Sequence, residues 1–250
     1  MATISASADA VAELVPDGAV VALEGTGPHL PLAATRALLR RAPRDLTLVR
    51  LDPGLPGDQL IGAGCVRRLV FARADGDLHR FREALLAGQP TPLEIEEYTG
   101  AVLVARYTAG AAGLPFGTLR GARGTDLPEH DTVSAVRCPF TGEVLTAVAA
   151  LRPDVAVLHA RRADRAGNVQ FPGLPGIQRE VALASHRVLV TVEELVDELP
   201  PDPGVVLPGF TVDRIAVVGR QPPPDEAARE WDAVSRDPAR FGRWLAEVRA

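Results

Sequence analysis

The 250-residue sequence contains no lysine, because all 27 of its basic residues are arginine. Lysine is the residue that forms Schiff bases with carbonyl substrates and that completes a phosphate-binding P-loop. Neither chemistry is therefore open to this chain. The two cysteines, Cys65 and Cys138, stand far apart and belong to no CxxC or CxxH pattern. We accordingly expect neither a disulfide framework nor a cysteine-based zinc site, and we assign no metal ligands.

Other signatures are missing as well. The sequence has no GxSxG, HExxH or EF-hand pattern, so serine-hydrolase and metalloprotease chemistry have no support. A net charge of -5 without a basic patch predicts no nucleic-acid partner. The apolar runs are too short to span a bilayer, and residues 1–15 lack the basic start of a signal peptide. We expect a cytoplasmic protein with no membrane association.

The stretch from Leu151 to Gln170 organises the rest of the chain. Its apolar segment, Val155 to Leu158, is bounded by an Arg-Pro-Asp corner on one side and by charged residues on the other. A short apolar run of this kind is typical of a central parallel strand, which is covered by helices on both faces. Ligands of open α/β sheets bind beyond the carboxyl ends of the strands. Residues His159 to Asn168 are expected to lie there.

Apolar patterns and turn residues predict the other elements. Strands are expected at 19–23, 46–51, 68–72, 93–98, 133–137, 144–148, 187–192, 205–206 and 215–218. Helices are expected at 6–14, 32–41, 78–87, 99–112, 178–185, 193–198 and 225–248, the last broken at Asp237-Pro238, and 117–131 is expected to be a loop. The alternation predicts an α/β fold with an open, mostly parallel sheet and helices on both faces. We expect residues 1–220 to form this domain and 221–250 a C-terminal helical extension.

Two glycine-rich segments are candidate binding loops. Gly25-Thr26-Gly27 lies between a predicted strand and a predicted helix, where backbone N–H groups and the helix dipole favour an anion. Gly62-Ala63-Gly64 offers a second close backbone approach. A dinucleotide fingerprint needs a third glycine, and Leu30 stands in its place. The alternative is that both segments only let the chain reverse its direction.

Charged residues at the ends of predicted strands are the other candidates. Glu96 and Glu97 precede a predicted helix, where a carboxylate can act as nucleophile or general base, or can simply pair with Arg106. His159 ends an apolar strand, where a buried structural histidine is the commoner explanation. The arginines that follow could bind a phosphate or a carboxylate, although Asp164 offers an internal partner; they are Arg161, Arg162 and Arg165.

Several segments, taken together, resemble the family I CoA-transferases, specifically the alpha subunit of the glutaconate CoA-transferase type. They run in the family's order and cover most of residues 15–200. The segments are GDQLIGAG at 57–64, EEYT at 96–99, AAGLPFGTLRGARGTDLP at 111–128, CPFTGE at 138–143, ALRPDVAVLHARRADRAGNVQ at 150–170 and LVTVEELVD at 189–197.

The resemblance implies a parallel α/β sheet and a heterodimer or heterotetramer with a beta subunit. In such transferases a glutamate from the beta subunit attacks the acyl-CoA thioester, and an acceptor carboxylate finally takes over the CoA. The motif that carries this glutamate, of the Ser-Glu-Asn-Gly type, is absent from this sequence. We therefore expect a CoA thioester as substrate, no bound cofactor, and a nucleophile that the partner supplies. Both glycine segments would line the acyl pocket.

The sequence departs from the family pattern in the first glycine loop. Alpha subunits of this type usually carry Gly-Gly-Phe there, whereas this chain reads EGTGPHLP at 24–31. Related subunit pairs open a steroid-derived ring in a CoA thioester, and their activity depends on an alpha-subunit glutamate that matches Glu97. Three functions thus stay open: a transferase subunit, a C–C hydrolase subunit that uses Glu97, and a non-catalytic scaffold that shapes the partner's pocket.

Overall fold

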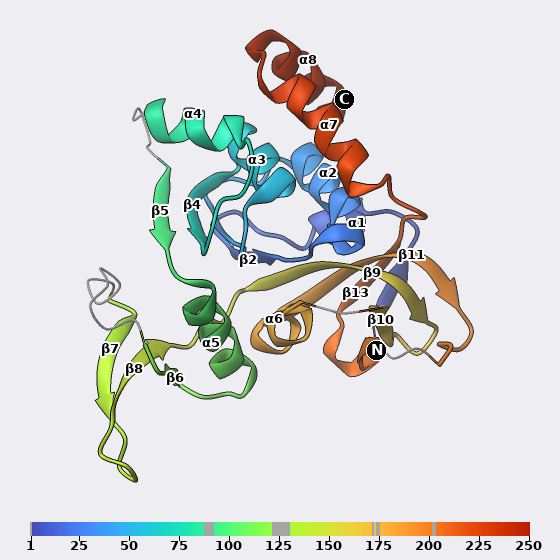
Figure 1. The fold of residues 1–250 in the computed structure, drawn as a ribbon. Coiled ribbons are helices and arrows are strands. Elements are labelled where there is room, and N and C mark those ends of the chain that lie inside the picture. The colour runs from blue at the N-terminus through green and yellow to red at the C-terminus, as the bar shows by residue number, and fades with distance from the viewer. Residues whose placement is uncertain (1, 88–92, 122–130, 172, 174–175, 202–203) are drawn as a thin grey trace.

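A row of eight parallel strands forms the centre of the molecule, in the order β1-β13-β11-β9-β2-β3-β4-β5 (Figure 1). The computed structural model describes residues 2–87, 93–121, 131–171, 173, 176–201 and 204–250. The eight strands are β1 (Thr3–Ser5), β2 (Val20–Leu23), β3 (Leu46–Val49), β4 (Val66–Phe71), β5 (Glu94–Glu97), β9 (Val155–Asp164), β11 (Arg187–Val196) and β13 (Arg214–Val217). The predicted open, mostly parallel α/β sheet is confirmed.

Strand β9 is longer than its apolar run suggested. It continues through His159 to Asp164 because the equally long β11 pairs with it as far as Val196, opposite Asp164. The same pairing shows that the helix predicted at 193–198 is wrong, since Glu194 to Val196 belong to β11. After Asp164 the chain turns into β10 (Val169–Phe171), which is antiparallel to β9 and pairs with β12 (Val205–Leu207).

Helices cover both faces of the sheet and bury two separate apolar cores. Helices α1 (Asp9–Ala12), α2 (Leu32–Arg41), α3 (Gly54–Gly62) and α4 (His79–Ala87) cover one face, and α5 (Gly100–Ala111) and α6 (Gln178–Ala184) cover the other (Figure 1). Thr99 caps α5 as predicted, because its side chain accepts a hydrogen bond from the N–H of Val102. Short 3₁₀ turns follow β2 (η1, Gly27–His29) and precede β13 (η3, Gly209–Thr211).

A small antiparallel sheet, β6-β8-β7, projects from the domain next to α5 (Figure 1). Its strands are β6 (Phe116–Leu119), β7 (Val133–Arg137) and β8 (Val144–Ala149). The predicted pair at 133–137 and 144–148 is confirmed. The loop predicted for 117–131 begins instead with strand residues, and its part at 122–130 lies outside the described residues.

The chain ends in two helices, α7 (Pro224–Ser235) and α8 (Pro238–Arg249), which pack over the α2–α4 side (Figure 1). The predicted break at Asp237-Pro238 is confirmed, since the Asp237 carboxylate caps α8 by accepting from the N–H of Ala239 at 2.8 Å. Trp231 fixes α7 to α3 by donating its indole N–H to Asp58 at 2.8 Å. No helix in the described ranges combines the length and the apolarity that crossing a bilayer requires.

Candidate functional site

The strand order reverses between β2 and β9. From β2 the chain proceeds outward through β3, β4 and β5, whereas from β9 it proceeds the opposite way through β11 and β13. In open α/β sheets ligands bind at this switch point, outside the carboxyl ends of the strands. The segment Gly25–His29 follows β2 at this edge. Strand β9 extends past β2, whose last residue Leu23 lies opposite Val157, and so brings His159 to the same edge.

A cavity of about 480 Å³ lies at this switch point. We call it the switch-point cavity. Its lining comes from the turn after β2, from β9 and β11, and from the segment after β13. The lining residues are Pro28, His29, His159, Arg161, Glu193, Glu194 and Arg220. This composition of imidazole, guanidinium and carboxylate groups suits a polar or anionic ligand.

The turn after β2 is closed so tightly that only glycine fits at its start. Gly25 has φ +146°, and a Cβ atom there would lie 2.0 Å from the carbonyl oxygen of His29. His29 is thereby directed inward, where its ring meets Phe171 edge-to-face at 5.8 Å between centroids. Thr26 and Gly27 remain exposed at the rim of the turn.

The predicted anion site at the start of α2 is already occupied in part. The N–H of Ala33 donates to the side chain of Gln221 at 2.7 Å, and Gln221 in turn donates to the carbonyl of Leu30 at 3.0 Å. One of the unpaired N–H groups at this helix end is therefore satisfied within the protein. The glycine turn contributes to the site mainly by the position that it gives to His29.

A buried ion pair of the neighbouring strand ends holds this turn, and the sequence analysis missed it. Arg50, at the end of β3, donates to the carbonyls of Leu23, Gly25 and Asp52, the last at 2.7 Å. Glu24 accepts from the N–H of Leu51 at 2.7 Å. Both side chains are at most 3% exposed. Burial raises the pKa of Glu24 to about 7, although the positive charge of Arg50 opposes the shift.

A signal for this pair was present in the sequence. Glu24 and Arg50 each come directly after a buried apolar strand, and consecutive parallel strands end at the same edge of a sheet. A charged residue at both places indicates a pair across the strand ends. Beside the pair, the buried hydroxyl of Tyr107 has no hydrogen-bond partner among the described residues. Burial raises the pKa of Tyr107 well above its ordinary value.

The second glycine segment lies elsewhere. Gly62 ends helix α3, which was expected to be a loop, and the chain continues through Ala63 and Gly64 toward the amino-terminal end of β4. That end is the edge of the sheet opposite the switch point. A Cβ atom on Gly62 would lie 2.7 Å from the side chain of Arg80, so this glycine permits close packing of α3 and α4. The structure therefore does not bring the two glycine segments together in one pocket.

Glu96 and Glu97 point to opposite faces of the edge strand β5, because neighbouring strand residues alternate. Glu96 lies on the α5 side, where it accepts from Tyr98 and from Arg106, the latter at 3.4 Å. The pairing with Arg106 that the sequence left open is thus present for Glu96. Glu97 is exposed, and no described residue hydrogen-bonds or ion-pairs with its side chain. Three strand spacings, about 14 Å, separate β5 from β2.

His159 is both buried and part of the switch-point cavity. It is 1% exposed, and its Nδ1 atom lies 2.9 Å from the hydroxyl oxygen of Thr191 on β11. Burial lowers the pKa of His159 to about 4, and the charge of the nearby His29 adds to the shift. The imidazole is therefore neutral at pH 7. It can position a ligand or move a proton without itself carrying a charge.

The pKa of His159 predicts a pH-dependent loss of stability. An unfolded histidine has a pKa of about 6.5, so the unfolded chain gains this proton first as the pH falls. The contribution of His159 to the free energy of unfolding is complete above pH 6.5 and is lost by about pH 4, a difference of about 3 kcal/mol. Urea unfolding of the wild type and of His159→Gln should therefore give curves that converge by this amount between pH 7.5 and pH 4. A pH-independent gap would contradict the assignment.

The arginines after His159 have carboxylate partners on β11 and beyond. Arg162 pairs with Glu194, and Arg165 lies 2.7 Å from Asp197. The expected partner Asp164 instead closes the turn into β10 by accepting from the backbone and side-chain N–H groups of Asn168 at 2.9 and 2.7 Å. Arg161 is half-exposed and only 4.0 Å from Glu194. Of the three predicted anion-binding arginines, it is therefore the one that lines the cavity.

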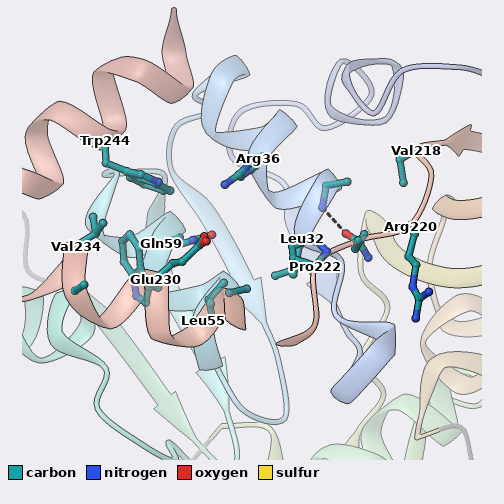
Figure 2. Close-up of a pocket in the computed structure, with 15 residues that line it drawn as sticks. Leu32, Arg36, Leu55, Gln59, Val218, Arg220, Pro222, Glu230, Val234 and Trp244 are labelled. Carbon is teal, nitrogen blue, oxygen red and sulfur yellow. Dashed lines mark hydrogen bonds between the residues drawn. The ribbon is translucent and has the colours of Figure 1, made fainter. Parts of the chain in front are cut away.

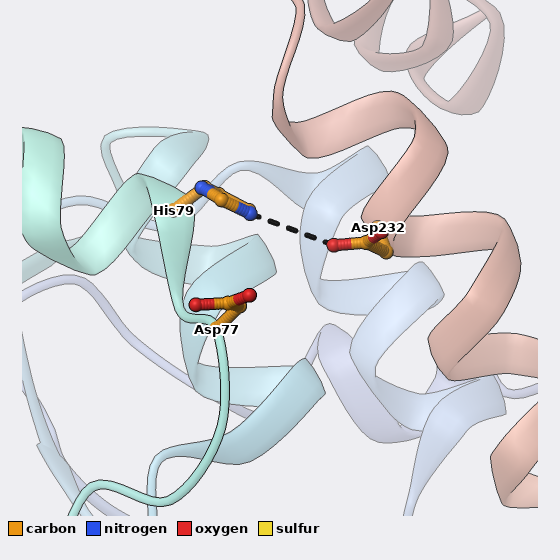
Figure 3. A group of neighbouring side chains, drawn as sticks. All are labelled: Asp77, His79 and Asp232. Carbon is orange, nitrogen blue, oxygen red and sulfur yellow. Dashed lines mark ion pairs between the residues drawn. The ribbon is translucent and has the colours of Figure 1, made fainter.

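Asp77, His79 and Asp232 form another polar cluster, at the junction of α4 and α7 (Figure 3). The Nε2 atom of His79 lies 3.5 Å from Asp232. The guanidinium of Arg236 lies 2.8 Å from Asp232 and 3.3 Å from Asp77. A cation thus already sits between the two carboxylates. We interpret the cluster as the ionic contact that fixes α7 to the domain.

An open parallel sheet with a polar cavity at its switch point defines a ligand-binding α/β protein, and similarity to known proteins specifies its family. Residues 4–217 match the family described as coenzyme A transferase, and the chain belongs to this family. It is 43% identical to the first of the two subunits of the 3-oxoadipate CoA-transferase of Pseudomonas knackmussii, over 99% of this chain and 93% of that protein. It is 31% identical to the cholesterol ring-cleaving hydrolase IpdA subunit of Mycobacterium tuberculosis, over 77% of this chain and 71% of that protein.

Solved structures agree with this assignment. The decarboxylase AibA/AibB matches with a TM-score of 0.87 and 31% identity, over 99% of both chains. The glutaconate CoA-transferase of Acidaminococcus fermentans matches with a TM-score of 0.86 and 26% identity, over 98% of this chain and 87% of that chain. The resemblance drawn from the sequence motifs, and the fold that it implied, are confirmed.

Proposed function

We propose that the chain is the alpha subunit of a heteromeric CoA-transferase that moves CoA between an acyl-CoA and a carboxylic acid. The observation that carries the proposal is the 43% identity to the corresponding subunit of the 3-oxoadipate enzyme, which extends over nearly the whole length of both chains. A beta subunit is the implied partner. The complex is placed in the cytoplasm, which agrees with the two free thiols of Cys65 and Cys138.

The reaction divides one exchange between thioester and carboxylate into easier steps. A glutamate that the beta subunit supplies attacks the acyl-CoA, forms a mixed anhydride and releases the CoA thiolate. The thiolate then attacks the glutamyl carbonyl, which yields a glutamyl thioester and frees the first carboxylate. An acceptor carboxylate reverses both steps, so the new acyl-CoA forms and the glutamate is regenerated. No bound cofactor takes part.

In this scheme the alpha subunit supplies the walls of the pocket. The side chain of Glu24 is buried and tied to Leu51, so it is poorly placed to act as a nucleophile itself. Arg161 and Arg220 can pair with a carboxylate that enters the switch-point cavity, and the neutral imidazole of His159 lies in its wall. The turn Gly25–Gly27 forms the rim of the acyl pocket.

The decisive experiment is turnover by this chain co-expressed with the beta subunit encoded beside it. A panel of acyl-CoAs is incubated with and without an added acceptor, including 3-oxoadipate and glutaconate, and the CoA esters are separated by chromatography. A transferase consumes the donor only when the acceptor is present, and it forms one equivalent of the new acyl-CoA. Consumption without acceptor would refute the proposal and favour the hydrolase.

The hydrolase alternative depends on Glu97, because the resemblance to ring-cleaving subunits carries their catalytic glutamate to this position. We expect Glu97→Gln to retain transferase turnover within about threefold, since the exposed Glu97 lies far from the switch point and touches no described charged group. Glu96→Gln is the matched control. It should lower the melting temperature by weakening the contacts with Tyr98 and Arg106. A folded but inactive Glu97→Gln variant would favour the hydrolase.

A scaffold role is the third possibility, and it differs in the result of single substitutions. A scaffold would raise the activity of the beta subunit without any essential side chain of its own. If Arg161→Gln, Arg220→Gln and His159→Gln all leave kcat and KM of the complex unchanged, the chain acts as a scaffold. Loss of activity in any of these folded variants assigns part of the pocket chemistry to this chain.

A further inference from the structure

A second, larger cavity lies between the C-terminal helices and the domain (Figure 2). Its volume is about 570 Å³, within the range of small-molecule sites. Its walls come from α2, α3, α7, α8 and the segment Val218–Pro222. It contains none of the site residues discussed so far except Arg220. We call it the helical cavity.

Gln59 of α3 is the feature of the helical cavity that indicates a ligand. This residue is 8% exposed and its side chain faces the cavity (Figure 2). No described residue hydrogen-bonds its side-chain amide. A buried amide without partners costs free energy, so such groups in native proteins are usually satisfied by water or by a bound molecule. A primary amide offers one acceptor and two donors side by side, which matches the N6 and N7 edge of adenine.

The other lining groups agree with an adenine nucleotide. The indole of Trp244 extends into the cavity, where it can stack on a base (Figure 2). Trp231 forms the wall behind it, fixed by its hydrogen bond to Asp58. Arg36 lies across from Trp244 and has no ion-pair partner among the described residues, so its guanidinium is available to a phosphate. Glu230 offers a carboxylate to the exocyclic amine of adenine.

The helical cavity is continuous with the switch-point cavity. A small cavity of about 220 Å³ lies between them, with Leu32, Gln221 and Pro222 in common with the helical cavity. It shares Pro28 and Glu193 with the switch-point cavity. Arg220 lines all three cavities. This arrangement suits a ligand with a nucleotide at one end and a long flexible arm that reaches a reactive group at the other.

We propose that the helical cavity binds the adenine nucleotide end of the CoA thioester, with the base against Gln59 and Trp244 and a phosphate on Arg36. The source of the nucleotide rests on the proposed function, because CoA is the transferase substrate that carries adenine. The pantetheine arm then follows the small cavity past Arg220 and brings the thioester to the switch-point cavity. The alpha subunit thus binds the nucleotide of CoA as well as shaping the acyl pocket.

The test compares CoA and pantetheine substrates in the complex of both subunits. Gln59→Leu and Arg36→Gln should each raise KM for acyl-CoA, and Kd for CoA by titration calorimetry, about tenfold, with kcat unchanged. KM for the matching acyl-pantetheine, which lacks the nucleotide, should not change. Arg229→Gln is the control, because this exposed arginine of α7 carries the same charge outside the cavity lining. ADP should compete with CoA in the wild type.

The outcomes separate this inference from the proposed function. An active complex in which Arg36→Gln and Gln59→Leu bind CoA like the wild type overturns the inference and leaves the transferase intact. Equal losses for acyl-CoA and acyl-pantetheine also overturn it, because the substitutions then act through the fold. Gln59-dependent binding of ADP but not of CoA assigns the cavity to a free nucleotide, against the proposal. A complex without transferase activity that still binds CoA through Gln59 supports the inference alone.

Discussion

Replacing Arg50 by methionine is expected to destabilise the protein by about 3–5 kcal/mol, which lowers the melting temperature by about 10 °C. The substitution keeps most of the apolar stem but removes the donors to the carbonyls of Leu23, Gly25 and Asp52. It also leaves Glu24 buried without the opposing charge. Breaking a buried ion pair on one side is much more costly than its net contribution, because the remaining charge stays desolvated. Urea unfolding measures the loss.

The pH dependence of this loss identifies its cause. The pKa of Glu24 is already raised to about 7, so its contribution to folding is complete below the unfolded value near 4.5 and is lost as the pH rises through 7. Without Arg50 this pKa rises further, and the destabilisation of Arg50→Met should be larger at pH 8 than at pH 5. The double variant with Glu24→Gln should recover part of the loss at pH 8. Arg44→Met, at a side chain 79% exposed, should change stability by at most about 1 kcal/mol.

If the loss in Arg50→Met is the same at pH 5 and pH 8, Glu24 does not depend on Arg50 for its charge, and the pair is only a set of hydrogen bonds. If the loss is below about 1 kcal/mol at both values, the turn after β2 is held by other contacts. Either result would move the support of the switch-point cavity to the packing of His29 on Phe171.

Apolar patterning predicted the elements whose burial is regular. Helix α2 was predicted at its observed bounds of Leu32–Arg41 because its apolar residues recur at helical spacing and its last turn is basic. The break between α7 and α8 followed from Asp237-Pro238, where the cap and the proline act locally. Such features depend on neighbours in the sequence, so the sequence alone contains them.

The elements that the sequence misassigned depend on partners far along the chain. Glu193 to Glu198 has helical composition, yet pairing with the long β9 keeps Glu194 to Val196 extended. Helix α3 contains glycine and proline and was expected to be a loop. It forms because Gly57 and Gly62 permit contacts with Leu48 and Arg80 that larger residues would obstruct. Long-range packing of this kind overrides local propensity.

The candidate site was predictable in its location but not in its members. The glycine turn and His159 were identified because both follow or lie in buried strands. Three lining residues, His29, Glu193 and Arg220, were not, since they come from three different segments that only the strand order brings together. That order cannot be obtained from periodicity. Gly62 shows the converse, because its sequence context suggested a binding loop and its strand end faces the opposite edge.

Replacing Gly25 by alanine is expected to have the largest effect on activity, a loss of at least about a hundredfold in kcat/KM of the complex. The new methyl group would lie 2.0 Å from the carbonyl oxygen of His29, at a φ of +146° that alanine rarely adopts. The turn must therefore open, and His29 then leaves the wall of the switch-point cavity. We expect a destabilisation of about 3 kcal/mol or more, from backbone strain and the clash together.

Gly27→Ala is the matched control in the same turn. Gly27 also has a positive φ, +53°, but a Cβ atom there meets nothing within 4 Å. The substitution adds only the strain of a left-handed alanine, about 1 kcal/mol, and should leave kcat/KM within about threefold. Turnover and urea unfolding of both variants separate the two effects. Equal losses at Gly25 and Gly27 would mean that the flexibility of the turn, rather than the position of His29, supports the reaction.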